Sequence, residues 1–147
     1  MEVFKASSIE KFNYDMLRCL FNEMPKFSLT GENFKAYIEK IQKNGIIFYT
    51  KKNQDITSFI GFYANDRETF TAYLSCIVVS PHLKGSGIAQ QLFDKMCDVA
   101  ISNGMKRLKF TVLKENLRAI SFYKKNKMFF KLSLTDETRW DLEKDLI

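Results

Sequence analysis

One stretch of the sequence determines the expected fold and site: Ile77-Val78-Val79-Ser80-Pro81-His82-Leu83-Lys84-Gly85-Ser86-Gly87-Ile88-Ala89. It begins as an apolar, β-branched strand and passes through a glycine-bearing loop directly into a helix, whose apolar residues keep helical spacing as far as Val99. A helix N-terminus exposes backbone N–H groups and a partial positive charge, and glycines let a ligand approach that backbone closely. The stretch therefore predicts a loop that binds a phosphate group.

Upstream of this stretch, the sequence predicts a short strand, two helices and a meander of strands. The first strand covers 3–6, and a helix follows from the capping box formed by Ser7 and Glu10 to Pro25. A second helix begins at Thr30 or Gly31 and ends at 44–45. Apolar runs at 46–50, 56–64 and 70–79 are joined by short polar turns, which is typical of antiparallel strands.

Downstream, the helix that follows the glycine loop ends at Asn103-Gly104. It is followed by a strand at 108–113, a short helix at 117–125 and strands at 129–134 and 139–142. The order β-α-α-β-β-β-α-β-α-β-β predicts an α/β (α+β) fold with a mixed, mostly antiparallel central sheet and helices on both faces. The helix between the strands 70–79 and 108–113 should make them parallel neighbours. No linker or repeat interrupts the 147 residues, so we expect a single domain over 1–147.

Composition and charge exclude several classes of protein. No apolar run approaches the roughly 20 residues that span a bilayer, and the first residues do not resemble a signal peptide, so we expect a cytoplasmic protein with no membrane contact. Three widely spaced cysteines and one histidine indicate neither a disulfide framework nor a metal site. The segment 84–131 has 11 basic and 3 acidic residues, a balance of 11 − 3 = +8, which would attract a phosphorylated cofactor or nucleic acid. A solvated basic surface explains the same excess.

The glycine loop matches neither of two common phosphate-binding motifs. In a Walker A loop the lysine follows the glycines, whereas Lys84 precedes them. The loop also lacks the third small residue of a dinucleotide fingerprint, and no acidic residue lies about 20 positions further on.

Instead, Lys84-Gly85-Ser86-Gly87-Ile88-Ala89 resembles motif A of the Gcn5-related N-acetyltransferase (GNAT) family, [Q/R]-x-x-G-x-[G/A], with lysine at the first position. The residues 116–125, Asn-Leu-Arg-Ala-Ile-Ser-Phe-Tyr-Lys-Lys, resemble its motif B, N-x-x-A-x-x-F-Y-x-K-x-G-F, although Lys127-Met128 replaces the final G-F and puts the local turn in doubt. The spacing of the motifs and the order of elements are also similar to that family. The resemblance implies an acetyl-CoA-dependent N-acetyltransferase without a metal.

The resemblance also implies a set of residues that bind the coenzyme. Backbone groups of Ile77, Val78 and Val79 would bind the pantetheine arm, and the N–H of Val78 or Val79 would polarise the thioester carbonyl. Backbone N–H groups of Lys84, Gly85, Ser86, Gly87, Ile88 and Ala89 would hold the pyrophosphate. Lys84 would add a point charge, and Lys124 and Lys125 could meet the adenosine phosphates. Asn116 would bind pantetheine, although its position also suits a helix N-cap.

Tyr123 matches the tyrosine that protonates the leaving thiolate in this family, and the resemblance therefore implies a catalytic and coenzyme-binding role. A core aromatic residue beside Phe122 is the alternative. The strand before the loop contains no carboxylate, His82 lies on the outer approach of the loop, and we assign no general base. The alternative function is that of a catalytically weak, acyl-CoA-binding regulator of the same fold. The sequence of such a protein would look alike except at Tyr123.

The amine acceptor is left open as a small molecule or a peptide. The resemblance places it near 21–31 and 63–70, where Phe21, Met24, Phe27 and Phe34 could form an apolar wall or pack on the sheet. The balance of −2 outside the basic segment, from 12 basic and 14 acidic residues, suits a cationic amine. We expect no nucleic-acid binding, because Phe110, Phe122 and Phe129 have core-like positions. Small members of the family often form homodimers.

Overall fold

The computed structural model of the chain describes residues 2–6, 31–53 and 55–147. In this part of the chain one sheet has the strand order β1-β2-β3-β4-β5-β7-β6, in which β4 and β5 are parallel and the other neighbours antiparallel. The strands have the following bounds: β1 Phe4–Lys5, β2 Ile46–Lys52, β3 Asp55–Tyr63, β4 Thr71–Val79, β5 Arg107–Leu113, β6 Phe129–Leu132 and β7 Arg139–Asp145.

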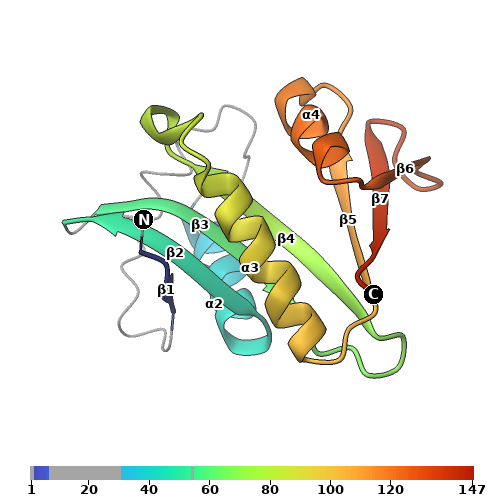
Figure 1. The fold of residues 1–147 in the computed structure, drawn as a ribbon, viewed down its shortest axis with the longest axis horizontal. Helices are drawn as coiled ribbons and strands as arrows, with labels where there is room; N and C mark the ends of the chain where they lie inside the picture. Colours follow the sequence, from blue (N-terminus) through green and yellow to red (C-terminus); the bar gives the residue numbers. More distant parts are fainter. Residues whose placement is uncertain (1, 7–30, 54) are drawn as a thin grey trace.

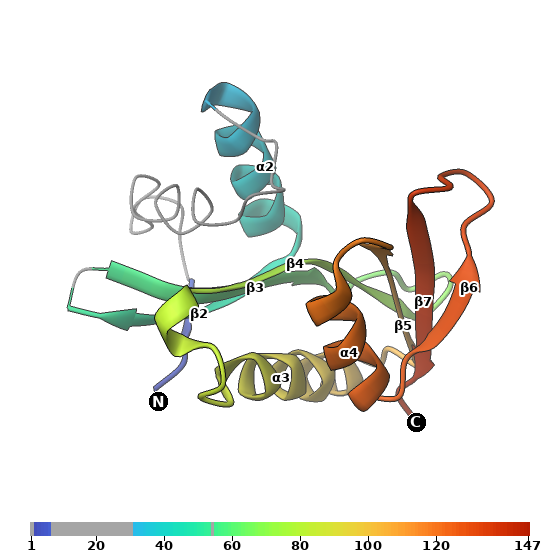
Figure 2. The same ribbon diagram turned by 90° about the horizontal axis from the view of Figure 1, so that it is seen from above.

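The helices lie on both faces of this sheet. Figure 2 shows α2 (Gly31–Asn44) on one face and α3 (Ile88–Ser102) with α4 (Leu117–Lys125) on the other. A short 3-10 helix, η2 (Pro81–Leu83), lies between β4 and α3. The parallel pairing of β4 and β5 follows from the α3 crossover, as the sequence predicted.

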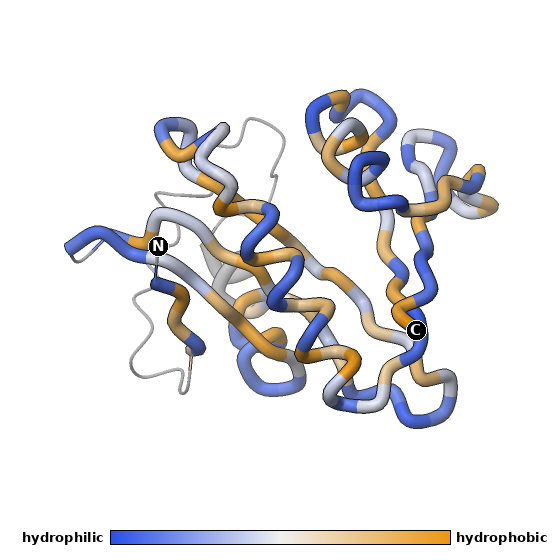
Figure 3. The backbone as a smooth tube through the Cα atoms, viewed as in Figure 1, coloured by the Kyte–Doolittle hydropathy of each residue, from blue (hydrophilic) through white to orange (hydrophobic). Residues whose placement is uncertain are grey.

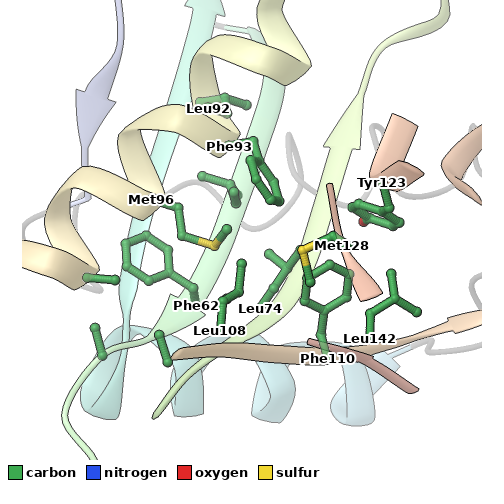
Figure 4. Close-up of a cluster of buried hydrophobic side chains, with 14 of the residues drawn as sticks. Phe62, Leu74, Leu92, Phe93, Met96, Leu108, Phe110, Tyr123, Met128 and Leu142 are labelled. Carbon is green, nitrogen blue, oxygen red and sulfur yellow. The ribbon is translucent and has the colours of Figure 1, made fainter. Parts of the chain in front are cut away.

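Two apolar clusters hold the layers together. The larger one lies between the sheet and α3, with Leu92, Phe93 and Met96 of that helix buried against Phe62 and Leu108 (Figure 4). Figure 3 shows apolar stretches along β3 and β4 and the alternation of apolar and polar residues along α3. The smaller cluster joins α2 to the opposite face of the sheet. Ile38 and Ile41 of the helix pack there with strand residues that point away from the first cluster, namely Ile47, Ile56, Phe59 and Val78.

The strands β4 and β5 pair only at their beginnings. Their register covers Thr71 to Tyr73 of β4 against Arg107 to Lys109 of β5. Beyond that point β5 continues to pair with β7 as far as Leu113, while β4 continues to pair with β3. Figure 1 shows β4 and β5 beginning close together and diverging toward α4. Among the described residues, this divergence leaves one backbone edge of β4 without a neighbouring strand.

The predicted fold class is confirmed, and the boundaries agree to within a few residues. The helix Leu117–Lys125 has the predicted limits, whereas β6 ends at Leu132 and β7 extends to Asp145. The predicted first helix and its capping box lie outside the described residues. The expectation that Phe129 lies in the core was wrong, since this residue is 61% exposed on the edge strand β6.

Candidate active site

The free edge of β4 presents backbone polar groups to the divergence. The N–H of Ser80 donates to the Thr57 carbonyl of β3 at 2.9 Å, which fixes the phase of the antiparallel ladder. Because bonded and non-bonded pairs alternate along such a ladder, Val78 opposite Phe59 also bonds to β3. Ile77 and Val79 then direct their N–H and C=O groups away from β3. Of the three predicted strand residues, Ile77 and Val79 therefore have backbone polar groups on the free edge of β4. The N–H of Val78 is used in a hydrogen bond to β3.

The glycine loop leaves a set of N–H groups free at the start of α3. Gly85 and Gly87 have φ angles of 85° and 86°, a left-handed conformation that favours glycine. The N–H groups of Gly85, Gly87, Ile88 and Ala89 have no backbone acceptor in the described part of the chain. A Cβ atom at Gly87 would find nothing within 4 Å, so the loop is open on that side. These groups form a cradle for an anion at the positive end of the helix.

Two of the predicted loop residues use their N–H groups within the loop. The N–H of Lys84 donates to the Pro81 carbonyl at 3.2 Å, and the N–H of Ser86 donates to the Leu83 carbonyl at 3.1 Å. The side chains of Lys84 and Ser86 are exposed beside the cradle. His82 lies on the outer approach, as predicted, with its Nδ1 atom 2.8 Å from the Ser80 hydroxyl.

Asn116 forms the N-cap of α4. Its side-chain oxygen accepts the Ala119 N–H at 3.2 Å, and its carbonyl accepts the Ile120 N–H at 3.0 Å. The cap confirms the structural reading of this residue. The amide nitrogen of Asn116 is not used in the cap, so the same side chain retains donors for a ligand.

Tyr123 lies at the inner face of α4, with its ring almost fully buried. Its ring centroid is 4.7 Å from that of Phe110 on β5 and 6.3 Å from that of Phe93 on α3 (Figure 4). Its hydroxyl makes no hydrogen bond to the described residues. No described polar side-chain atom is both fully buried and unpaired, so the unpaired Tyr123 oxygen retains some exposed surface.

Burial and the neighbouring strand set the protonation state of Tyr123. Burial is the main cause that raises its pKa well above the usual value for tyrosine, and the Cys76 thiol on β4 adds to the shift. The phenol is therefore protonated throughout the neutral range. It can donate a proton, which is the state that protonation of a leaving thiolate requires.

The end of α4 shows how the chain accommodates Lys127 in place of the family's glycine. The Met128 N–H donates to the Tyr123 carbonyl at 3.1 Å, and the Lys127 N–H donates to the Lys124 carbonyl at 3.0 Å. These bonds form a Schellman motif, in which glycine is the usual left-handed residue. Lys127 adopts this conformation with φ of 62°. The turn geometry is therefore kept, with the strain that a Cβ atom brings.

A reciprocal amide pair holds α4 against α3. Gln90 Nε2 donates to Asn126 Oδ1 at 2.6 Å, and Asn126 Nδ2 donates to Gln90 Oε1 at 3.1 Å. Lys144 of β7 also donates to the Asn126 carbonyl at 3.0 Å. Since Gln90 lies in the first turn of α3 and Asn126 follows α4, this pair connects the anion cradle to the helix that carries Tyr123.

The opposite face of β4 carries polar groups that the sequence analysis missed. The Tyr37 hydroxyl of α2 is 2.7 Å from the Ser75 hydroxyl and 3.2 Å from the Ser75 carbonyl oxygen. The sequence shows Tyr37 only as part of an apolar helical stripe, and no local signal places Ser75 beside it. Of the predicted acceptor wall, 21–30 and the Phe34 side chain lie outside the described residues.

The described part of the chain shows neither a metal-binding cluster nor a membrane-spanning helix. No group of three or more His, Cys, Asp or Glu side chains there could hold a metal ion. None of the helices described is long and apolar enough to cross a membrane. Phe129 is an exposed ring with the Lys131 ammonium 5.9 Å from its centroid, but that lysine also forms an ion pair with Glu143.

Comparison with solved structures defines the class of fold. An N-acetyltransferase from Staphylococcus aureus Mu50 has a TM-score of 0.71 and 19% identity, with all of both chains covered. The PaiA N-acetyltransferase from Thermoplasma acidophilum, in complex with coenzyme A, has a TM-score of 0.71 and 18% identity, with 99% of each chain covered. At these identities the likeness establishes an acetyltransferase fold.

Sequence comparison then gives the family. The profile of the Acetyltransferase (GNAT) family matches residues 13–128, and the chain belongs to this family. A curated relative, the thialysine N-epsilon-acetyltransferase of Bos taurus, is 38% identical over 52 residues, which are 35% of this chain. The match spans 31% of that relative's length. The family predicted from the two motifs is confirmed.

Proposed function

We propose that the protein is an N-acetyltransferase that transfers an acetyl group from acetyl-CoA to a primary amine. One observation carries the proposal: the free edge of β4 lies between the anion cradle at the start of α3 and the Tyr123 hydroxyl on α4. An elongated ligand with phosphates at one end and a thioester at the other fits this order of groups.

The coenzyme would be held mainly by backbone groups. The N–H groups of Gly85, Gly87, Ile88 and Ala89 would donate to the pyrophosphate, and the helix N-terminus adds a favourable field. The exposed Lys84 ammonium would add charge without the directional fork of an arginine. This arrangement agrees with the excess of positive charge in 84–131, which attracts an anionic ligand.

The thioester end would lie along β4 and below α4. The Ile77 and Val79 edge would bind the pantetheine arm in the way an added strand binds, and Asn116 would contribute its free amide donors. A β4 N–H aimed at the carbonyl oxygen stabilises the charge that develops when an amine attacks. With its phase on the ladder, Val79 fits this role better than Val78.

Tyr123 would act as the general acid. The N–C bond forms as the C–S bond breaks, and the phenol proton passes to the thiolate sulfur. Burial holds the proton on Tyr123 until the sulfur leaves, and it disfavours a thiolate and a phenolate alike, so the proton would pass to sulfur only as the C–S bond breaks. The resulting phenolate is returned to its neutral form by the proton that the attacking amine releases, through solvent.

The acceptor is proposed only as a class, a primary amine on a small molecule or a peptide. The bovine relative is named for its action on the ε-amine of thialysine, which makes this compound a sensible first probe. A preference for cationic amines, a homodimer, a cytoplasmic location and a single domain over 1–147 stay predictions of the sequence.

A two-stage experiment tests the proposal against a regulator that binds acyl-CoA without turnover. Calorimetry with coenzyme A measures binding, and thiol release from acetyl-CoA is then followed with thialysine, lysine, polyamines and peptides bearing a free α-amine. Binding with turnover of at least one amine supports the enzyme. Binding without turnover across the panel favours the regulator, and absence of coenzyme binding would refute both.

A further inference from the structure

Strand β4 contains a bulge at Ser75. Its register against β3 pairs Cys76 with Gly61 but Leu74 with Phe62, so that Ser75 is the extra residue. A bulge of this kind redirects the side chains around it. Here Ser75 and Cys76, although consecutive, both face α2, because Ser75 contacts Tyr37 and Cys76 packs in the α2 cluster. The bulge thus places a hydroxyl on the face of β4 opposite α3.

The Ser75 hydroxyl is fixed by Tyr37. The Tyr37 oxygen lies 2.7 Å from Ser75 Oγ and 3.2 Å from the Ser75 carbonyl oxygen. Burial raises the pKa of Tyr37, so its phenol is protonated and has one proton to donate. Whether that proton goes to the carbonyl, to Oγ or to the neighbouring Cys76 sulfur, the serine oxygen keeps at least one lone pair for another donor. The half-buried Ser75 side chain is thus oriented and still able to accept a hydrogen bond.

Ser75 lies at the vertex of the divergence between β4 and β5. It follows Tyr73, the last β4 residue paired with β5, and precedes Ile77, where the free edge begins. Tyr123 packs with the α3 cluster and Ser75 with α2, so the two hydroxyls lie on opposite faces of the sheet. A thioester on the free edge would have its leaving sulfur on the Tyr123 side. The attacking amine would then approach from the α2 side.

We propose that Ser75, held by Tyr37, accepts a hydrogen bond from an N–H of the acceptor amine and aims the nitrogen lone pair at the thioester carbonyl. This inference rests on the proposed function and assigns positioning residues to its acceptor side. Ser75 retains its own proton throughout. The nitrogen loses one proton to solvent, the carbon exchanges its bond to sulfur for a bond to nitrogen, and the sulfur gains a proton from Tyr123.

The test compares Ser75→Ala and Tyr37→Phe with two controls, with thialysine or another amine turned over by the wild type as the probe. Loss of one hydrogen bond to the amine should lower kcat/KM for the amine by about tenfold in Ser75→Ala. Tyr37→Phe should cause a smaller loss, because the serine remains but is less fixed. Ser75→Thr keeps the hydroxyl and should retain most activity. Tyr49→Phe removes a phenol hydroxyl from β2, two strands away in the same cluster, and should leave kcat/KM for the amine unchanged.

Coenzyme measurements separate this role from a structural one. The dissociation constant for acetyl-CoA and its slow hydrolysis without an amine should be unchanged in Ser75→Ala, and thermal unfolding checks the fold of each variant. If Ser75→Ala keeps the wild-type kcat/KM for the amine, or loses acetyl-CoA binding equally, the inference is wrong while the proposed function stands. If the wild type turns over no amine, the proposed function and this inference fail together.

Discussion

Replacement of Gly87 by alanine tests the proposed anion cradle. Gly87 has φ of 86°, and an alanine Cβ there would meet nothing within 4 Å. The fold should therefore survive, with only the strain of a left-handed residue, about 1–2 kcal/mol. For a chain of this size, a loss of 1 kcal/mol lowers the melting temperature by about 2–4 °C. We expect a melting temperature roughly 2–8 °C below that of the wild type.

The effect on coenzyme binding should be much larger than this loss of stability suggests. The new methyl group would occupy the open side of the loop, where the pyrophosphate would approach the N–H groups of Gly87 and Ile88. A hydrogen bond to a charged group contributes about 1.5–3 kcal/mol, so loss of one such bond weakens binding by about ten- to hundredfold.

Gly104 provides a matched control at the other end of α3. It has φ of 87°, and its Cβ would also meet nothing within 4 Å. Gly104→Ala should lower stability as much as Gly87→Ala and leave coenzyme binding unchanged. Thermal unfolding and calorimetry with coenzyme A measure the two effects separately. Equal affinity of the two variants for coenzyme A would refute the assignment of the loop to the pyrophosphate.

Further predictions concern α4 and its C-terminal turn. Tyr123→Phe should lower kcat about a hundredfold with little change in acetyl-CoA affinity, since it removes only the acid. An unchanged rate of acetyl transfer in single-turnover assays would contradict this role. Because burial raises the pKa of Tyr123, loss of its proton should not reduce kcat below about pH 10, and an alkaline loss at pH 8–9 that disappears in Tyr123→Phe would contradict its protonated state. Lys127→Gly should raise the free energy of unfolding by about 0.5–1 kcal/mol, since relief of left-handed strain exceeds the added backbone entropy, and a lower denaturation midpoint would show the strain to be relieved otherwise.

Local features of the sequence determined much of the fold and of the proposed coenzyme side of the site. The limits of α4 follow from the Asn116 cap and the turn beyond Lys125, and the anion cradle follows from Gly85 and Gly87 at the start of a helix. Such features depend on backbone angles and hydrogen bonds among residues close in the chain, so spacing alone reveals them. The order of elements followed from periodicity in the same way.

Other properties depended on how distant strands meet. The sequence placed Phe129 in the core, yet β6 is an edge strand and leaves this ring exposed, because strand order decides which apolar residues are covered. The sequence also did not decide whether Val78 or Val79 directs its N–H away from β3, since register with β3 sets the direction of these groups. Lys127 likewise adopts a left-handed conformation that the helix end demands, although lysine does not favour it.

The sequence by itself therefore determined the class of protein, the helix that follows the glycine loop, and Tyr123 as the candidate acid. Only the tertiary structure decided the divergence of β4 from β5, the burial of Tyr123 and the contact of Tyr37 with Ser75. The physical reason is the separation in sequence between the residues that interact. Caps and glycine turns are satisfied within a few residues, whereas a bulge, a free edge and a contact between residues 38 positions apart arise from long-range pairing.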